Sequence, residues 1–181
     1  MNAIFLSAAA LLAAPPLAAE PAADRTHAQA PEQAAAQAPS QAAEQAEVAA
    51  AADAFLKALG STRKTDLAGV MLPEGTIFIH NRMQPEAPRL DIVPVAQHLV
   101  RWAGTSGRFF ERMRYDTVLV DGDMAQVWGP YAFLANSRVA HCGINSLSFV
   151  KRDGQWKVAN TSMTMERPSE CKRLGAPGMG E

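Results

Sequence analysis

The chain has 181 residues, which is enough for one domain with attached segments but too short for two full domains. Its 17 lysine and arginine residues nearly balance 18 acidic residues, giving a formal net charge of -1. Without a basic patch, the chain is predicted neither to bind nucleic acid nor to attach electrostatically to an anionic membrane.

The first nineteen residues have the pattern of a secretory signal peptide. An apolar run over 4–14 is too short to cross a bilayer comfortably, and small residues that suit a signal peptidase follow it. No lysine or arginine precedes Ile4, so an uncleaved N-terminal anchor or an apolar tail remains the alternative. We expect a signal peptide at 1–19, a mature protein without a membrane span, and a periplasmic or secreted location.

Residues 20–43 are expected to form a flexible linker. They are rich in alanine, glutamine, proline and glutamate and include no large apolar residue. Such a segment buries too little surface to offset the conformational entropy lost on ordering. The folded domain is expected at 44–167, followed by a C-terminal tail at 168–181.

Three helices and one strand are predicted in the first half of the domain. The helical segments are 44–59, 61–73 and 91–102. Apolar residues at helical spacing mark the first helix, which Gly60 ends, and Asp91 is expected to cap the third. A strand is predicted at 75–80 from its β-branched and aromatic residues, and a loop with two prolines at 81–89.

The second half is predicted to be a meander of four long strands. The strand segments are 109–120, 124–135, 138–152 and 155–166. Asp-Gly pairs at 121–122 and 153–154 separate apolar runs, a pattern typical of β-hairpin turns. Helices followed by a meander predict an α+β fold in which each helix packs one apolar stripe on the sheet.

This order of elements resembles the NTF2-like superfamily, which includes the SnoaL-like proteins. The most specific stretches are DGDMAQV at 121–127, CGINSLSFV at 142–150 and DGQWKV at 153–158. The resemblance covers about 44–167 and implies a cone in which three N-terminal helices pack on a strongly curved, mainly antiparallel sheet. This fold hosts isomerases, dehydratases, cyclases and non-catalytic binding or dimerisation modules, so the resemblance implies no single activity.

Two cysteines, Cys142 and Cys171, are predicted to form a disulfide. An even number of cysteines in an exported protein favours a disulfide, and neither has a second ligand at metal-finger spacing, so no metal site is predicted. Alternation places Leu147 and Phe149 on the core face of their strand, so Cys142 faces outward. A tail returning from Pro168 brings Cys171 to that outer side.

The same alternation predicts a polar-lined pocket at the open end of the cone. The candidate residues are His80 and His141 as catalytic groups, with Tyr131, Asn145 and Asn160 as ligand-binding groups. Each has an alternative structural role, because histidines at strand ends, buried amides and core tyrosines commonly satisfy hydrogen bonds in the interior. No phosphate loop, Ser-His-Asp order or histidine-rich spacing is present, so no cofactor is predicted.

Three functions remain open from the sequence. The first is binding of a small organic molecule in the pocket. The second is cofactor-free acid-base catalysis, in which His80 or His141 moves the proton and Tyr131 and Asn145 orient the substrate or stabilise an oxyanion. The third is homodimerisation through the outer face of the sheet, where three residues are expected to be exposed: Trp128, Met163 and Met165.

Overall fold

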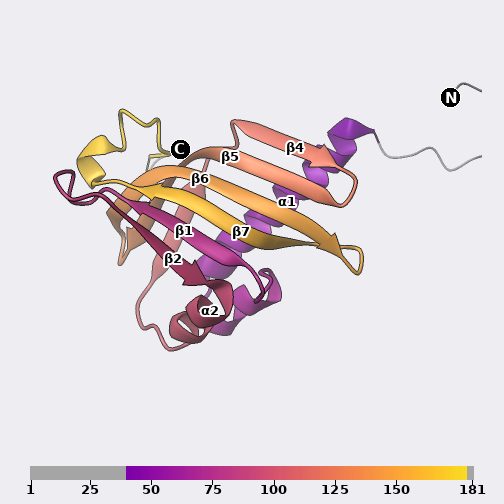
Figure 1. Cartoon of the computed structure of the whole chain (residues 1–181), viewed down its shortest axis with the longest axis horizontal. Helices are drawn as coiled ribbons and strands as arrows, with labels where there is room; N and C mark the ends of the chain where they lie inside the picture. Colours follow the sequence, from indigo (N-terminus) through magenta and orange to yellow (C-terminus); the bar gives the residue numbers. More distant parts are fainter. Residues whose placement is uncertain (1–39, 179–181) are drawn as a thin grey trace, which may run out of the picture. The chain divides into compact units, whose positions relative to one another are not determined.

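The computed structural model describes residues 40–178, which form an α+β domain (Figure 1). The predicted signal peptide, and the predicted linker up to residue 39, lie outside the described residues. Among the helices of residues 40–178, none is long and apolar enough to cross a membrane.

Seven strands of the described chain form one sheet. They are β1 (Thr76–Asn81), β2 (Arg89–Pro94), β3 (Phe109–Met113), β4 (Thr117–Asp121), β5 (Met124–Ala135), β6 (Arg138–Arg152) and β7 (Gln155–Met165). The order is β2-β1-β7-β6-β5-β3, and β4 also pairs with β5. Because β1 and β7 are parallel and the other pairs are antiparallel, the predicted mainly antiparallel sheet is confirmed.

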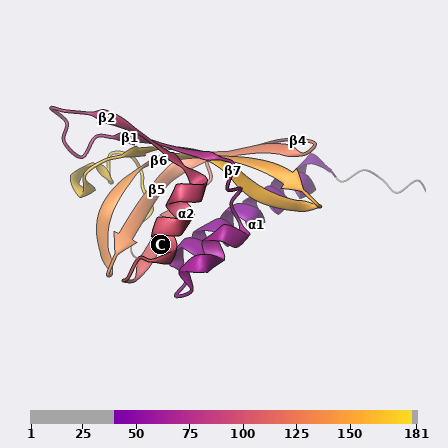
Figure 2. The same cartoon turned by 60° about the horizontal axis from the view of Figure 1, so that its bottom comes forward.

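Two α-helices and a short 3-10 helix lie on one face of this sheet, and β5 and β6 bend toward that side (Figure 2). They are α1 (Gln41–Gly60), η1 (Lys64–Gly69) and α2 (Val95–Ala103). The helix α1 begins at Gln41 because Ser40 caps it, accepting a hydrogen bond from the backbone of Ala43. Its buried side chains, among them Val48 and Phe55, pack on the sheet and form the main core.

The structure corrects the expected start of the third helix. Asp91 does not cap it but lies in β2, which pairs with β1, and its carboxylate accepts hydrogen bonds from Arg89 and Asn81. The helix α2 starts at Val95, directly after Pro94. The pairing of β2 with β1 outweighs the tendency of Asp91 to cap a helix. The same pairing shortens the predicted loop at 81–89, because Asn81 pairs with Arg89.

The predicted strand at 109–120 is divided into β3 and β4. At the division, Arg114 donates a backbone hydrogen bond to Pro130, and Asp116 donates one to Trp128. Between them, a Cβ on Gly129 would lie 1.8 Å from the carbonyl oxygen of Arg114. The backbone of residues 114–116 thus crosses close over β5, which only a glycine there permits.

A β-bulge at Ala159 decides which side chains of β7 face the helices. Phe149 pairs with Val158 but Ser148 pairs with Asn160, so Ala159 is the extra residue. From this point the alternation is reversed: Met163 and Met165 face the helices, and Asn160 and Ser162 face away. The bulge corrects the expected exposure of both methionines on the outer face.

The C-terminal tail covers the outer face of β5 and β6 at one end. It contains the 3-10 helix η2 (Pro168–Glu170) and the predicted disulfide between Cys142 and Cys171, which is confirmed, with a Cα–Cα distance of 5.6 Å. Cys142 is fully buried with Ala132 and Leu134 beneath the tail. Residues 168–178 are therefore part of the folded domain.

The remaining outer face of the sheet carries Trp128, whose side chain is 49% exposed, and the exposed Leu119 and Met124. Solvent-facing serines lie beside them on β6 and β7. Homodimerisation through this face stays a prediction.

Candidate functional site

A cavity of about 760 Å³ lies between the helices and the concave face of the sheet. Residues from α1, α2 and six of the strands of the described chain line it. Its floor is apolar, with Ile77 and Ile79 from β1 and Met163 from β7. The volume lies within the range of sites that bind small organic molecules.

Five aromatic rings follow one another in a continuous wall, and four of them line the cavity: His98, Trp102, Phe133 and His141. From α2 to β6 the ring centroids of His98 and Trp102 lie 5.7 Å apart, those of Trp102 and Phe109 5.1 Å, and those of Phe109 and Phe133 5.8 Å. Phe133 then stacks on His141 at 4.8 Å with nearly parallel planes. A wall of this kind offers flat contact surface to an unsaturated or aromatic ligand.

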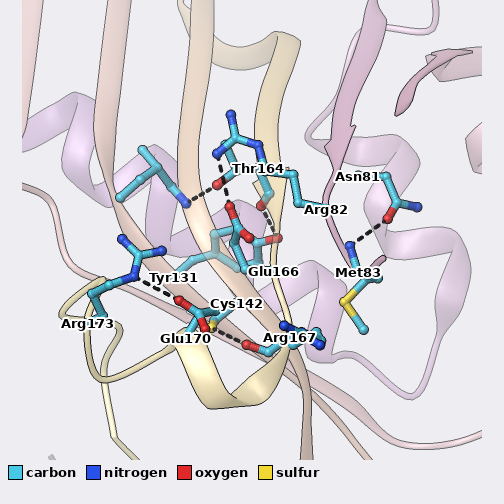
Figure 3. Close-up of polar contacts among 11 residues, drawn as sticks. Asn81, Arg82, Met83, Tyr131, Cys142, Thr164, Glu166, Arg167, Glu170 and Arg173 are labelled. Atoms are coloured by element: carbon cyan, nitrogen blue, oxygen red, sulfur yellow. Dashed lines mark hydrogen bonds and ion pairs between the residues drawn. The ribbon is translucent and has the colours of Figure 1, made fainter. Parts of the chain in front are cut away.

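The tautomer of His141 follows from its hydrogen bond with Tyr131. The Tyr131 hydroxyl donates to the carbonyl oxygen of Thr164 at 2.9 Å (Figure 3) and lies 3.0 Å from His141 Nδ1. A hydroxyl has one hydrogen, so Nδ1 must be the donor to Tyr131. The other nitrogen of His141, Nε2, therefore carries a lone pair, and within residues 40–178 it has no hydrogen-bond partner.

Gly143 allows this hydrogen-bond chain to form. It lies directly opposite Tyr131 on β6, and a Cβ there would be 2.0 Å from the Thr164 carbonyl oxygen. The tyrosine therefore reaches across a glycine to the third strand. Burial lowers the pKa of His141 to about 4 and raises that of Tyr131, so both side chains are uncharged at neutral pH.

A buried carboxyl group, Glu111 on β3, is a second polar centre of the cavity. Its Oε1 accepts a hydrogen bond from Asn145 Nδ2 at 3.2 Å. Burial raises the pKa of Glu111 to about 8, although the hydrogen bond from Asn145 acts in the opposite direction. Glu111 is therefore mainly protonated at pH 7 and carries an O–H group. Asn145 Oδ1, which is buried, has no partner within the described chain.

The structure brings together only some of the predicted site residues. His141 and Asn145 line the cavity, and Tyr131 lies behind His141. His80 faces the other side of the sheet, where its Nε2 lies 3.4 Å from Ser162 Oγ. Asn160 is also outside the cavity and accepts a hydrogen bond from the Thr76 backbone at 2.9 Å.

The alternation of side chains along β1 explains why His80 lies outside the cavity, and the bulge in β7 explains the same for Asn160. In β1, Ile77 and Ile79 face the cavity, so His80 faces away. The bulge at Ala159 turns Asn160 outward. The chemical roles of His141, Asn145 and Tyr131 remain predictions.

Sequence reasoning missed Glu111. Its signal was available: Glu111 alternates with Phe109 and Met113, so one acidic residue interrupts an otherwise apolar strand face. Two residues of α2, His98 and Trp102, also line the cavity and were not predicted as site residues.

Besides Glu111, three charged side chains line the cavity: Arg89, Asp91 and Arg101. The guanidinium group of Arg89 forms a salt bridge with Asp91 at 3.0 Å. Burial lowers the pKa of His98, and the nearby charge of Arg101 acts in the same direction. Within residues 40–178 no cluster of three or more histidine, cysteine or acidic side chains could hold a metal ion.

Replacing Glu111 by glutamine is expected to change how stability depends on pH. In the unfolded chain Glu111 titrates near 4.5 and in the folded chain near 8, so its contribution to stability is full below pH 4.5 and is lost as pH rises to 8. The lowered pKa of His141 has the opposite effect on the pH dependence of stability, and that effect is confined to pH values below about 6.5. Between pH 6.5 and pH 8, wild type should therefore lose roughly 2 kcal/mol more stability than Glu111→Gln, measured by urea unfolding. If the free energies of unfolding of the two proteins change with pH in parallel, Glu111 is not buried and protonated as described.

Comparisons with known proteins identify the fold. No family model and no curated protein matches the sequence. An NTF2-like protein of unknown function from Shewanella baltica matches 71% of this chain and 98% of its own, with a TM-score of 0.53 and 11% identity. A proposed dehydratase of the NTF2-like family from Streptomyces avermitilis matches 67% of this chain and 95% of its own, with a TM-score of 0.51 and 16% identity.

A third solved structure is the β subunit of a proposed aromatic-ring-hydroxylating dioxygenase from Novosphingobium aromaticivorans. It matches 68% of this chain and 89% of its own, with a TM-score of 0.55 and 12% identity. At such identities these matches establish the fold alone, and the predicted NTF2-like fold is confirmed.

Proposed function

We propose that this chain, with its NTF2-like fold, binds a small organic molecule in the concave cavity. The observation that carries the proposal is a cavity of about 760 Å³ whose walls are mainly apolar and aromatic but whose depth holds Glu111, Asn145 and His141. Small-molecule sites typically combine an apolar lining with a few placed polar groups.

The buried polar groups are costly for the folded state unless they serve a ligand. An unpartnered amide oxygen such as Asn145 Oδ1 costs on the order of 1 to 3 kcal/mol. Retention of a polar group at such a place supports a role in recognition.

The proposed site of action is the periplasm or the extracellular space. The Cys142–Cys171 disulfide supports this location, because disulfides persist in oxidising compartments and are rare in the cytosol.

Filling the cavity should weaken ligand binding. Met163 lines the cavity, so Met163→Trp is expected to weaken binding of N-phenyl-1-naphthylamine, a neutral dye that fluoresces in apolar sites, by about tenfold or more. Ser162→Trp places the same side chain on the other face of the same strand and is the matched control.

The measurement is a fluorescence titration of both variants and wild type, with circular dichroism to show that each is folded. The proposal requires that only Met163→Trp loses binding. Equal dye binding by all three proteins would place the dye on the surface and contradict the proposed pocket.

Acid-base catalysis is the second candidate function, and a specific observation favours it. The cavity holds a neutral acid, Glu111, and a neutral base, His141 Nε2, and their pKa values are displaced in opposite directions. For any substrate found, His141→Ala should remove turnover while His80→Ala should not. Turnover with an unchanged pH profile in the double variant His80→Ala/His141→Ala would exclude catalysis by either histidine.

A further inference from the structure

Four polar atoms of the cavity residues lack protein partners within the described chain. Two are donors: the Glu111 carboxyl group in its protonated form, through Oε2, and the indole nitrogen of Trp102. Two are acceptors: His141 Nε2, as its tautomer requires, and Asn145 Oδ1. The donors and acceptors are equal in number, and none belongs to a charged group at neutral pH.

The charged groups around Glu111 do not change this balance. Asp53 of α1 accepts a hydrogen bond from the Tyr115 hydroxyl at 2.6 Å. A second, more open hollow is lined by Glu111 together with four charged residues: Asp53, Lys57, Arg112 and Arg114. The pKa of Glu111 is set by its burial and by the hydrogen bond from Asn145. The two groups whose pKa values Glu111 helps to raise, Tyr115 and Tyr131, are uncharged at neutral pH.

Two of these four residues, Glu111 and His141, lie in one row across the sheet. Glu111 pairs with Phe133, and Phe133 pairs with His141, so the three residues form a row across β3, β5 and β6. Neighbouring strands are about 4.8 Å apart, so the backbones of Glu111 and His141 are about 10 Å apart, with the ring of Phe133 between them. A flat molecule of one or two fused rings fits this span.

We propose that the ligand is an uncharged, planar molecule that carries both a carbonyl-type acceptor and an N–H or O–H donor. The acceptor would receive the hydrogen bond of the Glu111 carboxyl group, and the donor would bind Asn145 Oδ1, whose amide already contacts Glu111. The ring system would pack on Phe133 and the aromatic wall. This inference rests on the proposed pocket and adds the chemical class of its occupant.

An anionic ligand fits the same set of groups less well. A carboxylate only accepts hydrogen bonds, so it would leave His141 Nε2 and Asn145 Oδ1 without a donor. Of the two arginines that line the cavity, Arg89 is already paired with Asp91.

A set of four matched probes tests the class by isothermal titration at pH 6.5. Quinolin-2-one is neutral and bears a carbonyl group beside an N–H group; N-methylquinolin-2-one lacks the donor, naphthalene lacks both groups, and naphthalene-2-carboxylate is an anion of the same size. We expect quinolin-2-one to bind about tenfold more tightly than its N-methyl derivative and about a hundredfold more tightly than naphthalene, since each hydrogen bond to a buried polar partner contributes about 1.4 kcal/mol. The anion should bind weakest.

The variant Glu111→Gln keeps a hydrogen-bond donor at position 111 but has no carboxyl group that can titrate. A glutamine amide accepts from Asn145 through its oxygen and donates through its nitrogen, as the protonated carboxyl does. Quinolin-2-one binding to wild type should fall about tenfold between pH 7 and pH 9.5, as Glu111 loses its proton, while binding to Glu111→Gln should stay level.

The outcomes separate this inference from the proposed function. If the naphthylamine dye binds in the cavity but quinolin-2-one and naphthalene bind equally at every pH, the class is wrong and the pocket stands. Tightest binding of the anion also overturns the class. Should Glu111→Gln fail to fold, the wild-type comparison of quinolin-2-one with its N-methyl derivative decides alone.

Discussion

Replacing Gly143 by alanine is expected to lower the free energy of unfolding by about 3 kcal/mol. The new Cβ would lie 2.0 Å from the Thr164 carbonyl oxygen and 2.6 Å from its hydroxyl oxygen. Both are atoms of the adjacent strand, so β6 and β7 must separate or Tyr131 must lose its hydrogen bond to Thr164. The melting temperature should fall by roughly 10 °C.

The matched control is Gly69→Ala. A Cβ at Gly69 meets no heavy atom within 4 Å, and the backbone of this glycine is not in the left-handed region. Its stability should stay within about 0.5 kcal/mol of wild type. Equal melting temperatures for Gly143→Ala and Gly69→Ala would show that β7 does not pack against Gly143 as described.

Removing the disulfide is the second large perturbation. The variant Cys142→Ala/Cys171→Ala opens a covalent loop between residues 29 apart in the sequence. On the chain-entropy model its closure contributes about 3 to 4 kcal/mol, and we expect the variant to lose most of that stability in guanidinium unfolding. The tail would then be held only by its contacts with Ala132, Leu134 and neighbouring side chains.

A reducing agent provides the control for this variant. It should lower the stability of wild type to that of the double variant and leave the double variant unchanged. Thiol labelling of unreduced, denatured wild type should detect no free cysteine. Two reactive thiols per chain, or an equal effect of the reductant on both proteins, would contradict the disulfide.

Both perturbations act on one strand. β6 presents His141 and Asn145 to the cavity, Gly143 to Thr164 of β7, and Cys142 to the tail. Gly143→Ala should therefore also weaken ligand binding, because Tyr131 holds the tautomer of His141. Loss of the disulfide should leave binding closer to wild type.

The sequence by itself determined the features that depend on local pattern. Apolar spacing located α1, and the Asp-Gly turns located the hairpins between β4 and β5 and between β6 and β7. Strict alternation along β6 placed His141 and Asn145 inside and Cys142 outside. Such patterns are legible because the periods of helix and strand are fixed by backbone geometry.

The tertiary structure alone decided where the alternation changes phase and which polar groups become buried. Gly75 leaves room for the bulged carbonyl of Ala159, since a Cβ there would lie 1.6 Å from that oxygen, and the bulge turns Asn160 out and Met163 in. The neutral state of Glu111 likewise depends on its burial between β5, β6 and α1. Bulges and desolvation arise from contacts between segments distant in sequence, so no local pattern could reveal them.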